Sequence, residues 1–438
     1  MKAKISKLAI NGGPKAVTMD PKDMFRWPIV TREDEEAVLD VLRRGAMSGN
    51  DVTIRFEKAF AKWLGVKYAL GYCNGTASIL GALWACGVGV GDEVICPTTT
   101  YWATLMPVLN LGATVVFADI DPRTLCIAPG DIEHRITRRT KAICLVHLYG
   151  HPADMDPIMK IARRHKIKVI EDCSHAHGGL YKGRKIGTIG DVACFSLMSG
   201  KPIPTGEAGI LATRQRPLWE RAVAFGFYER TSQNRWAKAD QRCITDPELA
   251  KFAGLPMGGF KHRMNQTCSA MGLVQLKHYP KRMAEIQKAM NYFWDGVEKI
   301  PGLRGHRPPK GSRSTMGGWY IPMGFYDPRR FGGLPVHKFA EAVKAEGCFC
   351  LGGLANGPLH VHRLFHEADI YGHGKPTVIA NTTRDVRQGP GSLPHAEGMN
   401  PVSFWAPYFR HYRPRVIDQY IKAMTKVAAN YRELLEKG

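Results

Sequence analysis

Continuous apolar segments alternate with segments of helical periodicity between about residues 90 and 215, and this alternation restricts the fold of the chain more than any other feature. The apolar segments are rich in β-branched residues and cover residues 93–97, 114–118, 141–148, 168–171 and 192–196, while residues 102–111 and 155–165 have helical spacing. Continuous apolar strands separated by helices are typical of a parallel sheet covered on both faces. We therefore predict an α/β architecture with a mostly parallel central sheet.

Acidic or hydroxyl side chains stand where several of these predicted strands end. They are Asp119, Asp121, Glu171, Asp172 and Ser196. Ligands of open α/β sheets bind at the carboxyl ends of the strands. The positions of these side chains therefore predict a binding site at that edge of the sheet.

The remainder of the chain suggests a second, smaller unit. A long helix is predicted over residues 277–297, a segment rich in proline and glycine follows at 301–318, and residues 415–435 are expected to form an amphipathic helix. We therefore place the junction between two units near residue 280. The expected division is an N-terminal arm (1–30), a large α/β domain (31–280) and a small C-terminal α/β lobe (281–438).

Composition excludes several protein classes. With 44% hydrophobic and 23% charged residues, the chain is expected to be globular rather than disordered. It contains no run of about 18 apolar residues, so no membrane span is predicted. The basic start from Met1 to Ile5 lacks the apolar stretch of a secretory signal. Eleven cysteines occur without a Cys-x-x-Cys pair, and Cys348 and Cys350 are too close for zinc spacing, so we expect reduced thiols in a cytoplasmic protein and no metal site.

The net charge of +22 is the one unusual bulk property. It is compatible with nucleic-acid binding or with anionic ligands and phosphate groups. The basic residues are spread along the chain, however, and the densest patches, at residues 163–168 and 410–415, are short. We interpret them as solvated faces and predict no nucleic-acid partner.

Three local motifs could take part in binding or catalysis, although each also has a structural explanation. The turn at residues 74–78 opens a helix and would point free N–H groups at an anion, or it could be an ordinary helix start. Asp172 ends a strand and could be a helix cap or an ion-pair partner. Lys201 lies in a loop of small residues after a strand. It could be the lysine that binds a cofactor, or a surface lysine with no such role. Together they meet the demands of pyridoxal 5'-phosphate (PLP) chemistry, which needs a phosphate cradle, a carboxylate and a lysine.

The sequence around these motifs resembles that of the DegT/StrS-type aminotransferases, a family of fold-type-I PLP-dependent transferases that aminate keto sugars and cyclitols. The resemblance extends over roughly residues 25–280 and is looser beyond. Its motifs, in order, are residues 91–95, 112–119, 140–143, 146–150 with 154–156, 169–176, 195–201 and 206–209.

The resemblance implies a role for each matching residue. Lys201 matches the lysine that carries PLP, and Asp172 matches the carboxylate that faces the pyridine nitrogen. His175 matches the residue that contacts the ring hydroxyl. Tyr101 falls where an aromatic ring stacks on the cofactor, although core packing would explain it as well.

Phosphate binding is implied for a second group of residues. Thr76, Ala77 and Ser196 match the phosphate cradle. Arg263 matches the cation that reaches the phosphate of the neighbouring subunit, with Lys261 a weaker second, although a surface ion pair would also explain Arg263. The resemblance therefore also implies a homodimer with shared active sites.

One subgroup looks closer than the rest. Gly200, Lys201 and the segments 325–328 and 331–334 resemble the scyllo-inosose aminotransferases, which typically take nitrogen from glutamine. Three departures from the family pattern are Ala208 in place of a glycine, Lys261 in place of an asparagine, and the absence of a tyrosine before Pro358. Because this tyrosine is absent, the resemblance does not identify the acceptor substrate.

The predicted function is therefore amino transfer from glutamine or glutamate to the ketone of a cyclitol or of a nucleotide-activated sugar. Two alternatives within the family are a sugar dehydratase, in which a histidine stands at the lysine position, and a non-catalytic regulatory protein. Lys201 favours amino transfer over the dehydratase.

Overall fold

A computed structural model describes residues 7–231 and 244–435 of the 438-residue chain. The segment from Met1 to Ile5, on which the expectation of no secretory signal depends, lies outside the described residues, as does Cys243. The ten described cysteines are all free thiols. No helix in the described ranges is both long enough and apolar enough to cross a membrane.

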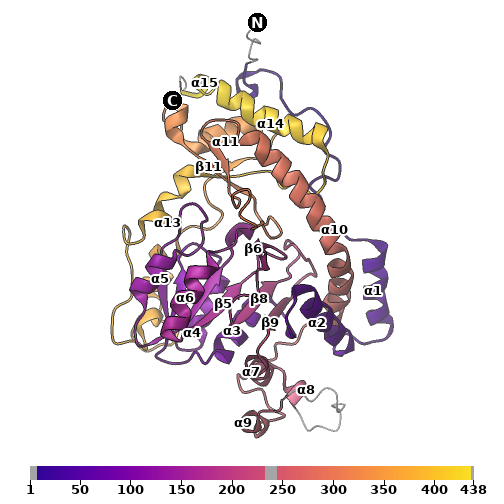
Figure 1. Ribbon diagram of the computed structural model, residues 1–438, viewed down its shortest axis with the longest axis vertical. Helices are drawn as coiled ribbons and strands as arrows, with labels where there is room; N and C mark the ends of the chain where they lie inside the picture. Colours follow the sequence, from indigo (N-terminus) through magenta and orange to yellow (C-terminus); the bar gives the residue numbers. More distant parts are fainter. Residues whose placement is uncertain (1–6, 232–243, 436–438) are drawn as a thin grey trace.

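A seven-stranded sheet forms the centre of the larger part of the molecule (Figure 1). Its strands β8, β5, β4, β2 and β3 are parallel, and β9 runs antiparallel between β1 and β8. In their order across the sheet, the strands are β1 (Tyr68–Tyr72), β9 (Gly209–Thr213), β8 (Val192–Ser196), β5 (Lys168–Asp172), β4 (Thr140–Val146), β2 (Glu93–Pro97) and β3 (Thr114–Ala118). The predicted mostly parallel α/β sheet is confirmed.

The five predicted strands all form, because their side chains are buried on both faces of the sheet. The sequence analysis did not identify β1 and β9. Glycine occurs in each of them, which weakens the apolar pattern that identified the others. The antiparallel strand β9 is important for the site because it follows the Lys201 loop and returns the chain into the sheet.

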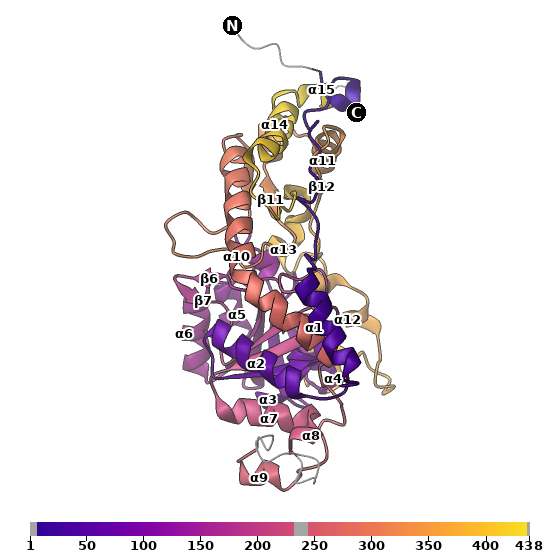
Figure 2. The same ribbon diagram turned by 90° about the vertical axis from the view of Figure 1, so that its right-hand side faces the viewer.

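Helices cover both faces of this sheet (Figures 1 and 2). The helices of the larger part are α1 (Arg32–Arg43), α2 (Asp51–Leu64), α3 (Gly75–Ala85), α4 (Met106–Asn110), α5 (Pro129–Arg135), α6 (Met155–His165), α7 (Arg216–Gly226), α8 (Tyr228–Thr231) and α9 (Pro247–Ala250). A small hairpin of β6 (Leu180–Tyr181) and β7 (Arg184–Lys185) lies above the sheet. The helix predicted over residues 102–111 is instead a 3-10 turn, Trp102–Thr104, followed by α4, because Pro107 starts a new helix.

The helix α10 (Gln266–Val297) is longer than predicted and connects the two parts of the molecule (Figure 1). It starts eleven residues before the predicted start at 277, where the Asn265 side chain accepts a hydrogen bond from the Thr267 amide. Pro280 lies inside it, so the domain boundary predicted near residue 280 falls within one continuous helix. That boundary stays a prediction.

The second part of the molecule contains an antiparallel four-stranded sheet with helices packed on it. Its strands are β10 (Leu303–Gly305), β11 (Met323–Tyr326), β13 (Ser403–Trp405) and β12 (Leu351–Gly352), and its helices are α11 (Val336–Ala345), α14 (Pro414–Ala429) and α15 (Arg432–Leu435). The predicted helix over residues 415–435 is therefore interrupted after Ala429. We propose that the small lobe comprises this sheet and its helices.

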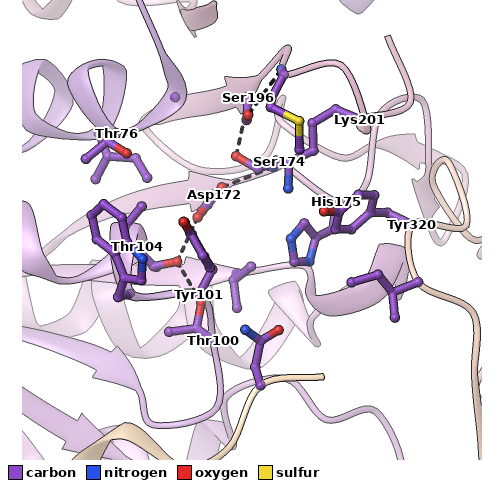
Figure 3. A pocket seen from close by; sticks show the side chains of 18 of the residues that line it. Thr76, Thr100, Tyr101, Thr104, Asp172, Ser174, His175, Ser196, Lys201 and Tyr320 are labelled. Atoms are coloured by element: carbon purple, nitrogen blue, oxygen red, sulfur yellow. Dashed lines mark hydrogen bonds between the residues drawn. The ribbon is translucent and has the colours of Figure 1, made fainter. Parts of the chain in front are cut away.

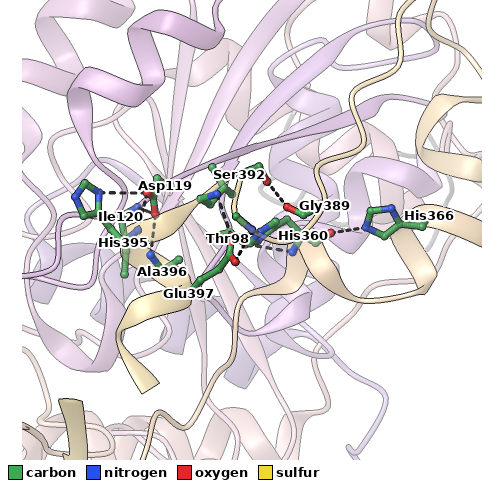
Figure 4. Close-up of polar contacts among 12 residues, drawn as sticks. Thr98, Asp119, Ile120, His360, His366, Gly389, Ser392, His395, Ala396 and Glu397 are labelled. Atoms are coloured by element: carbon green, nitrogen blue, oxygen red, sulfur yellow. Dashed lines mark hydrogen bonds and ion pairs between the residues drawn. The ribbon is translucent and has the colours of Figure 1, made fainter. Parts of the chain in front are cut away.

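A segment of the C-terminal region returns to the large sheet and is fixed there by polar contacts (Figure 4). It includes α12 (Leu364–Glu367) and α13 (Pro394–Gly398). The buried His360 hydrogen-bonds to Thr98 at 2.8 Å and to Glu397 at 3.0 Å. Asp119, at the end of β3, accepts hydrogen bonds from the amides of His395 (3.0 Å) and Ala396 (2.9 Å).

Asp119 therefore has a structural role rather than the ligand-binding role that its place at a strand end suggested. Its carboxylate is 6% exposed and satisfies N–H groups at the start of α13. An acidic side chain at a helix N-terminus is stabilising for this reason. Asp119 thus attaches the C-terminal segment to the edge of the sheet.

We expect Asp119→Ala to lower the free energy of unfolding by about 3 kcal/mol, because buried amides lose a charged acceptor. Urea unfolding measures this change. The control is Asp40→Ala, which removes an exposed carboxylate paired with Arg44 and should change stability by less than about 0.5 kcal/mol. Equal effects of the two substitutions would contradict the anchoring role.

Candidate active site

A cavity of ≈ 490 Å³ lies at the carboxyl ends of β5 and β8, beside the N-terminus of α3 (Figure 3). Of the predicted site residues, it is lined by Thr76, Tyr101, Asp172, His175, Ser196 and Lys201. Ala77 and Arg263 do not line it. Six residues that are separated by as many as 125 positions in the sequence therefore meet in one cavity.

Asp172 ends β5 with its carboxylate held in a fixed orientation. Its Oδ2 accepts a hydrogen bond from the Thr104 hydroxyl (2.8 Å), which is itself hydrogen-bonded to Thr100 (2.6 Å). Its Oδ1 accepts the Ser174 amide at 3.0 Å. Asp172 is 4% exposed and forms no ion pair among the described residues. Its charge therefore remains available for a cationic group in the cavity.

Lys201 extends into the same cavity from the loop between β8 and β9. It is only 7% exposed. Burial lowers the pKa of its ammonium to about 8, although Asp172 and Glu207 favour the charged form. A lysine with a lowered pKa has a larger fraction of free amine near neutral pH, which is the nucleophilic form.

His175 lies beside Lys201 and carries no charge at neutral pH. Burial, followed by the positive charge of Lys201, holds the pKa of His175 well below its ordinary value. Its Nδ1 accepts a hydrogen bond from the Tyr149 amide (3.3 Å), so the ring proton is on Nε2. The Tyr149 ring is stacked parallel to the imidazole and fixes its plane.

Tyr320 is the main site residue that the sequence analysis missed. It comes from the C-terminal region and places its ring 3.9 Å from Lys201 Nζ and 4.5 Å from the His175 ring (Figure 3). Its neighbours Trp319 and Ile321 both have positive φ, at 51° and 52°, which is a strained conformation for large side chains. The paired glycines 317 and 318, which precede Trp319, were the only local signal.

The N-terminus of α3 forms one corner of the cavity, and backbone N–H groups at such a position suit an anion. Gly75 approaches strand β8 so closely that a Cβ at position 75 would lie 2.8 Å from the Ser196 Cβ. Thr76 in the first turn and Ser196 at the end of β8 both line the cavity. The amide of Ala77 instead donates to the Asn74 side chain at 2.8 Å. The role predicted for Ala77 stays a prediction.

Tyr101 and Arg263 differ in their placement. Tyr101 stands at the mouth of the cavity with 47% of its surface exposed. Arg263 lies away from the cavity of its own chain, and its guanidinium donates to the Ser48 carbonyl at 3.0 Å. Lys261 beside it is exposed. The predicted roles of both cations concern a neighbouring subunit.

One group of side chains within the described residues has the spacing of a metal site: His147, Glu171 and Cys173. Its potential ligand atoms are already used in the protein. Glu171 accepts hydrogen bonds from His147 (3.0 Å) and from the amides of Gly187, Ile189 and Gly190, and His147 Nδ1 accepts the Ala153 amide. We interpret the group as structural, with Glu171 supporting the turn that leads into β8.

Sequence comparison identifies the family to which this fold and site belong. The model of the DegT/DnrJ/EryC1/StrS aminotransferase family matches residues 28–402. The chain belongs to this family. It is an aminotransferase of the fold-type-I class, and enzymes of the DegT/DnrJ/EryC1/StrS family depend on PLP.

Similar proteins include aminotransferases of known specificity. L-glutamine:2-deoxy-scyllo-inosose aminotransferase from Streptoalloteichus tenebrarius is 34% identical over 373 residues, which cover 82% of this chain and 84% of that protein. L-glutamine:scyllo-inosose aminotransferase from Streptomyces griseus is 33% identical, with 98% and 99% of the two chains covered. GDP-perosamine synthase from Caulobacter vibrioides is 40% identical over a shorter region, which covers 56% of this chain and 62% of that protein.

Solved structures agree with this assignment. The aminotransferase from Psychrobacter cryohalolentis superimposes with a TM-score of 0.77 and 29% identity, covering 93% of this chain and 99% of that one. DesI, solved in the presence of its TDP-sugar product, has a TM-score of 0.76 and 25% identity, with 98% of each chain covered.

The residues of the cavity fit PLP. Asp172 offers an oriented carboxylate without an ion-pair partner among the described residues, Lys201 offers a buried amine, and the first turn of α3 offers backbone amides that suit a phosphate. The neutral His175 offers an N–H to a ring oxygen. Each functional group of the cofactor thus has a complementary group in one cavity.

We expect Lys201→Met to stabilise the apoprotein by about 2 kcal/mol or more at pH 7, because the buried ammonium is costly. The folded pKa of about 8 lies below the ordinary 10.5, so the unfolded chain binds more protons between these values. The destabilising contribution is complete below about pH 8 and disappears as the pH approaches 10.5. Urea unfolding at pH 7 and pH 10 should therefore show the advantage of the variant falling below about 1 kcal/mol at pH 10. An advantage that is equal at both pH values would contradict the lowered pKa.

Proposed function

We propose that this enzyme moves an amino group from glutamine or glutamate to the ketone of a cyclitol or of a nucleotide-activated sugar. The observation that carries the proposal is the buried amine of Lys201 in the same cavity as the oriented carboxylate of Asp172. Relatives similar over nearly the whole chain act with glutamine on scyllo-inosose compounds, and this supports a cyclitol ketone as the acceptor.

Five groups would hold the cofactor in this proposal. Lys201 would carry PLP, and Asp172 would keep the ring nitrogen protonated. His175 would offer its Nε2–H to the ring hydroxyl, and the first turn of α3 with Thr76 and Ser196 would bind the phosphate. Tyr101 would cover the ring. When it is bound, PLP supplies an electron-accepting ring that stabilises negative charge on the adjacent carbon.

Lys201 is also the group that moves protons. As a free amine, Lys201 Nζ would take the proton from the α-carbon of the donor. In the second half of the reaction it delivers a proton to the former carbonyl carbon of the acceptor. The Tyr320 ring, 3.9 Å away, limits where the freed ammonium can go. Donor and acceptor use the same cavity in turn, which gives ping-pong kinetics.

The dehydratase alternative lacks its expected residue. One structural neighbour is a GDP-4-keto-6-deoxy-D-mannose-3-dehydratase, but at 21% identity it shares only the fold. Lys201 occupies the position at which a dehydratase of this family would carry a histidine. A regulatory role would leave the protein yellow but without a reaction with amino donors.

We further propose that the enzyme is a cytoplasmic homodimer. Ten free thiols, most of them buried, suit a reducing compartment. Exposed apolar side chains in the segment that precedes Arg263 in the sequence suit a protein interface; they are Phe252, Leu255, Met257 and Phe260. In such a dimer Arg263 would reach the phosphate in the partner's cavity.

Lys201→Ala should abolish both the yellow absorbance of the bound cofactor and transamination, because no other lysine of the described residues lines the cavity. Asp172→Asn keeps the shape of the side chain but not its charge, so we expect the cofactor to remain bound while turnover falls by at least about 100-fold. Absorbance spectra and single-turnover kinetics with glutamine measure both effects. Turnover in Lys201→Ala would refute the proposed function.

Mixed dimers test whether Arg263 acts across the interface. Lys201→Ala and Arg263→Ala homodimers should each be nearly inactive at limiting PLP. After random subunit exchange, about half of the dimers are mixed, and each has one intact site, so about a quarter of wild-type activity should return. If Arg263 served its own subunit, mixing would restore no activity.

A further inference from the structure

A second cavity adjoins the proposed active site on the side of the C-terminal region. Its volume is ≈ 490 Å³, and it shares Tyr320, Ile321 and Trp405 with the first cavity. Gly200, the residue before the cofactor lysine, also lines it. The remaining lining comes from the N-terminal arm and from the segments next to strands β11, β12 and β13. These residues are Phe25, Pro322, Phe349, Ala406, Pro407, Tyr408 and Arg410.

Among the described residues, Arg410 is the only charged side chain that lines this cavity, and it is 8% exposed. The centre of its guanidinium lies 4.2 Å from the Trp27 ring and 3.1 Å from the Tyr408 ring. The Tyr408 hydroxyl donates to the Gly318 carbonyl, and the Arg410 amide donates to the Met24 carbonyl at 3.0 Å. The guanidinium is therefore fixed between two aromatic rings.

The hydrogen-bonding groups of this guanidinium are not all satisfied. Nε and Nη1 of Arg410 are buried and have no acceptor among the described residues. No acidic side chain lines the cavity. Burial lowers the pKa of Arg410, yet an arginine keeps its proton in proteins. A buried cation with free N–H groups is unfavourable unless an anion completes it.

The cavity is also coupled to the lysine that performs the chemistry. Trp27, which stacks on Arg410, donates its indole N–H to the carbonyl oxygen of Lys201 at 3.0 Å. Tyr320 contacts the Lys201 amine and forms part of both cavities. A molecule bound to Arg410 would therefore lie beside the loop that carries Lys201.

We propose that Arg410 binds the α-carboxylate of the amino-acid donor, with the cavity lined by Tyr320, Trp405 and Tyr408 as the donor's carboxylate pocket. The inference rests on the proposed function, because it assigns a binding group for the donor of that reaction. A single guanidinium matches a single negative charge, whereas a diphosphate would need further cations. Phe25 and Phe349, 37% and 51% exposed, leave the cavity open to solvent for donor entry.

The first experiment compares glutamine with 4-aminobutanamide, which is glutamine without its α-carboxylate. The donor half-reaction of the holoenzyme is followed by the loss of the cofactor's yellow absorbance. In Arg410→Gln, kcat/KM for glutamine should fall by about 100-fold, to near the value for 4-aminobutanamide, while the value for 4-aminobutanamide itself stays unchanged. Arg410→Lys keeps the charge without the planar fork and should give an intermediate value.

Arg415→Gln is the matched control, because it removes an exposed arginine from the same segment. It should leave both donors unchanged. Thermal unfolding and cofactor absorbance of each variant show whether the fold and the PLP site are intact. An equal loss of activity with both donors in Arg410→Gln would show a structural role and overturn the proposal, as would an unchanged rate with glutamine.

A binding measurement is independent of turnover. Glutaramate, which is glutamine without its α-amine, should quench the tryptophan fluorescence of the wild-type holoenzyme, because Trp27 stacks on Arg410. Arg410→Gln should bind glutaramate at least about 30-fold more weakly. Inorganic phosphate is the competing anion, and tighter binding of phosphate than of glutaramate would overturn the assignment to a carboxylate.

The two proposals fail in different ways. If the wild-type enzyme shows no half-reaction with either glutamine or glutamate, the proposed function is wrong. If the wild type reacts with glutamine but Arg410→Gln reacts equally well, only the carboxylate pocket is wrong.

Discussion

The removal of the Lys201 amine from water is the physical constraint on which the site depends. A lysine in solution would be almost fully protonated at neutral pH, whereas burial lowers the pKa of this amine to about 8. The free-energy cost of burying the Lys201 ammonium is limited by Asp172 and Glu207, which favour the charged form, and by the face of the Tyr320 ring. The large sheet supplies the first carboxylate, and the C-terminal region supplies the ring. The reactive environment of the lysine therefore exists only when both parts of the molecule are assembled.

That assembly is secured by contacts far from the cavity. Helix α10 runs from the large sheet to the small one, and Asp119 and His360 attach the returning C-terminal segment to the ends of β3 and β2. Thr98, the partner of His360, begins the segment that contains Thr100, Tyr101 and Thr104. The anchoring of the C-terminal segment thus also positions the hydroxyl groups that orient Asp172 (Figures 3 and 4).

The sequence predicted those features that depend on neighbouring residues in the chain. The parallel strands were predicted from their continuous apolar segments. Asp172 and Lys201 were singled out because each stands at the end of such a segment or in the loop that follows it. Tyr320 and Arg410 could not be found in this way, because their roles depend on how the C-terminal region packs on the large sheet, more than a hundred residues away. The early start of α10 was missed because the signal at Asn265 is a capping side chain rather than an apolar pattern. Asp119 was misjudged because a strand-end carboxylate can equally cap a helix that is distant in sequence.

The close approach of Gly75 to Ser196 limits how this fold can diversify. Position 75 has no space for any side chain, so the corner where α3 meets β8 cannot be altered by substitution there. The walls of the two cavities that come from the C-terminal region are loops and strand ends without such contact to the cradle. Evolution of new specificities in an enzyme of this design would therefore proceed through the C-terminal walls, while the corner where α3 meets β8 stays fixed.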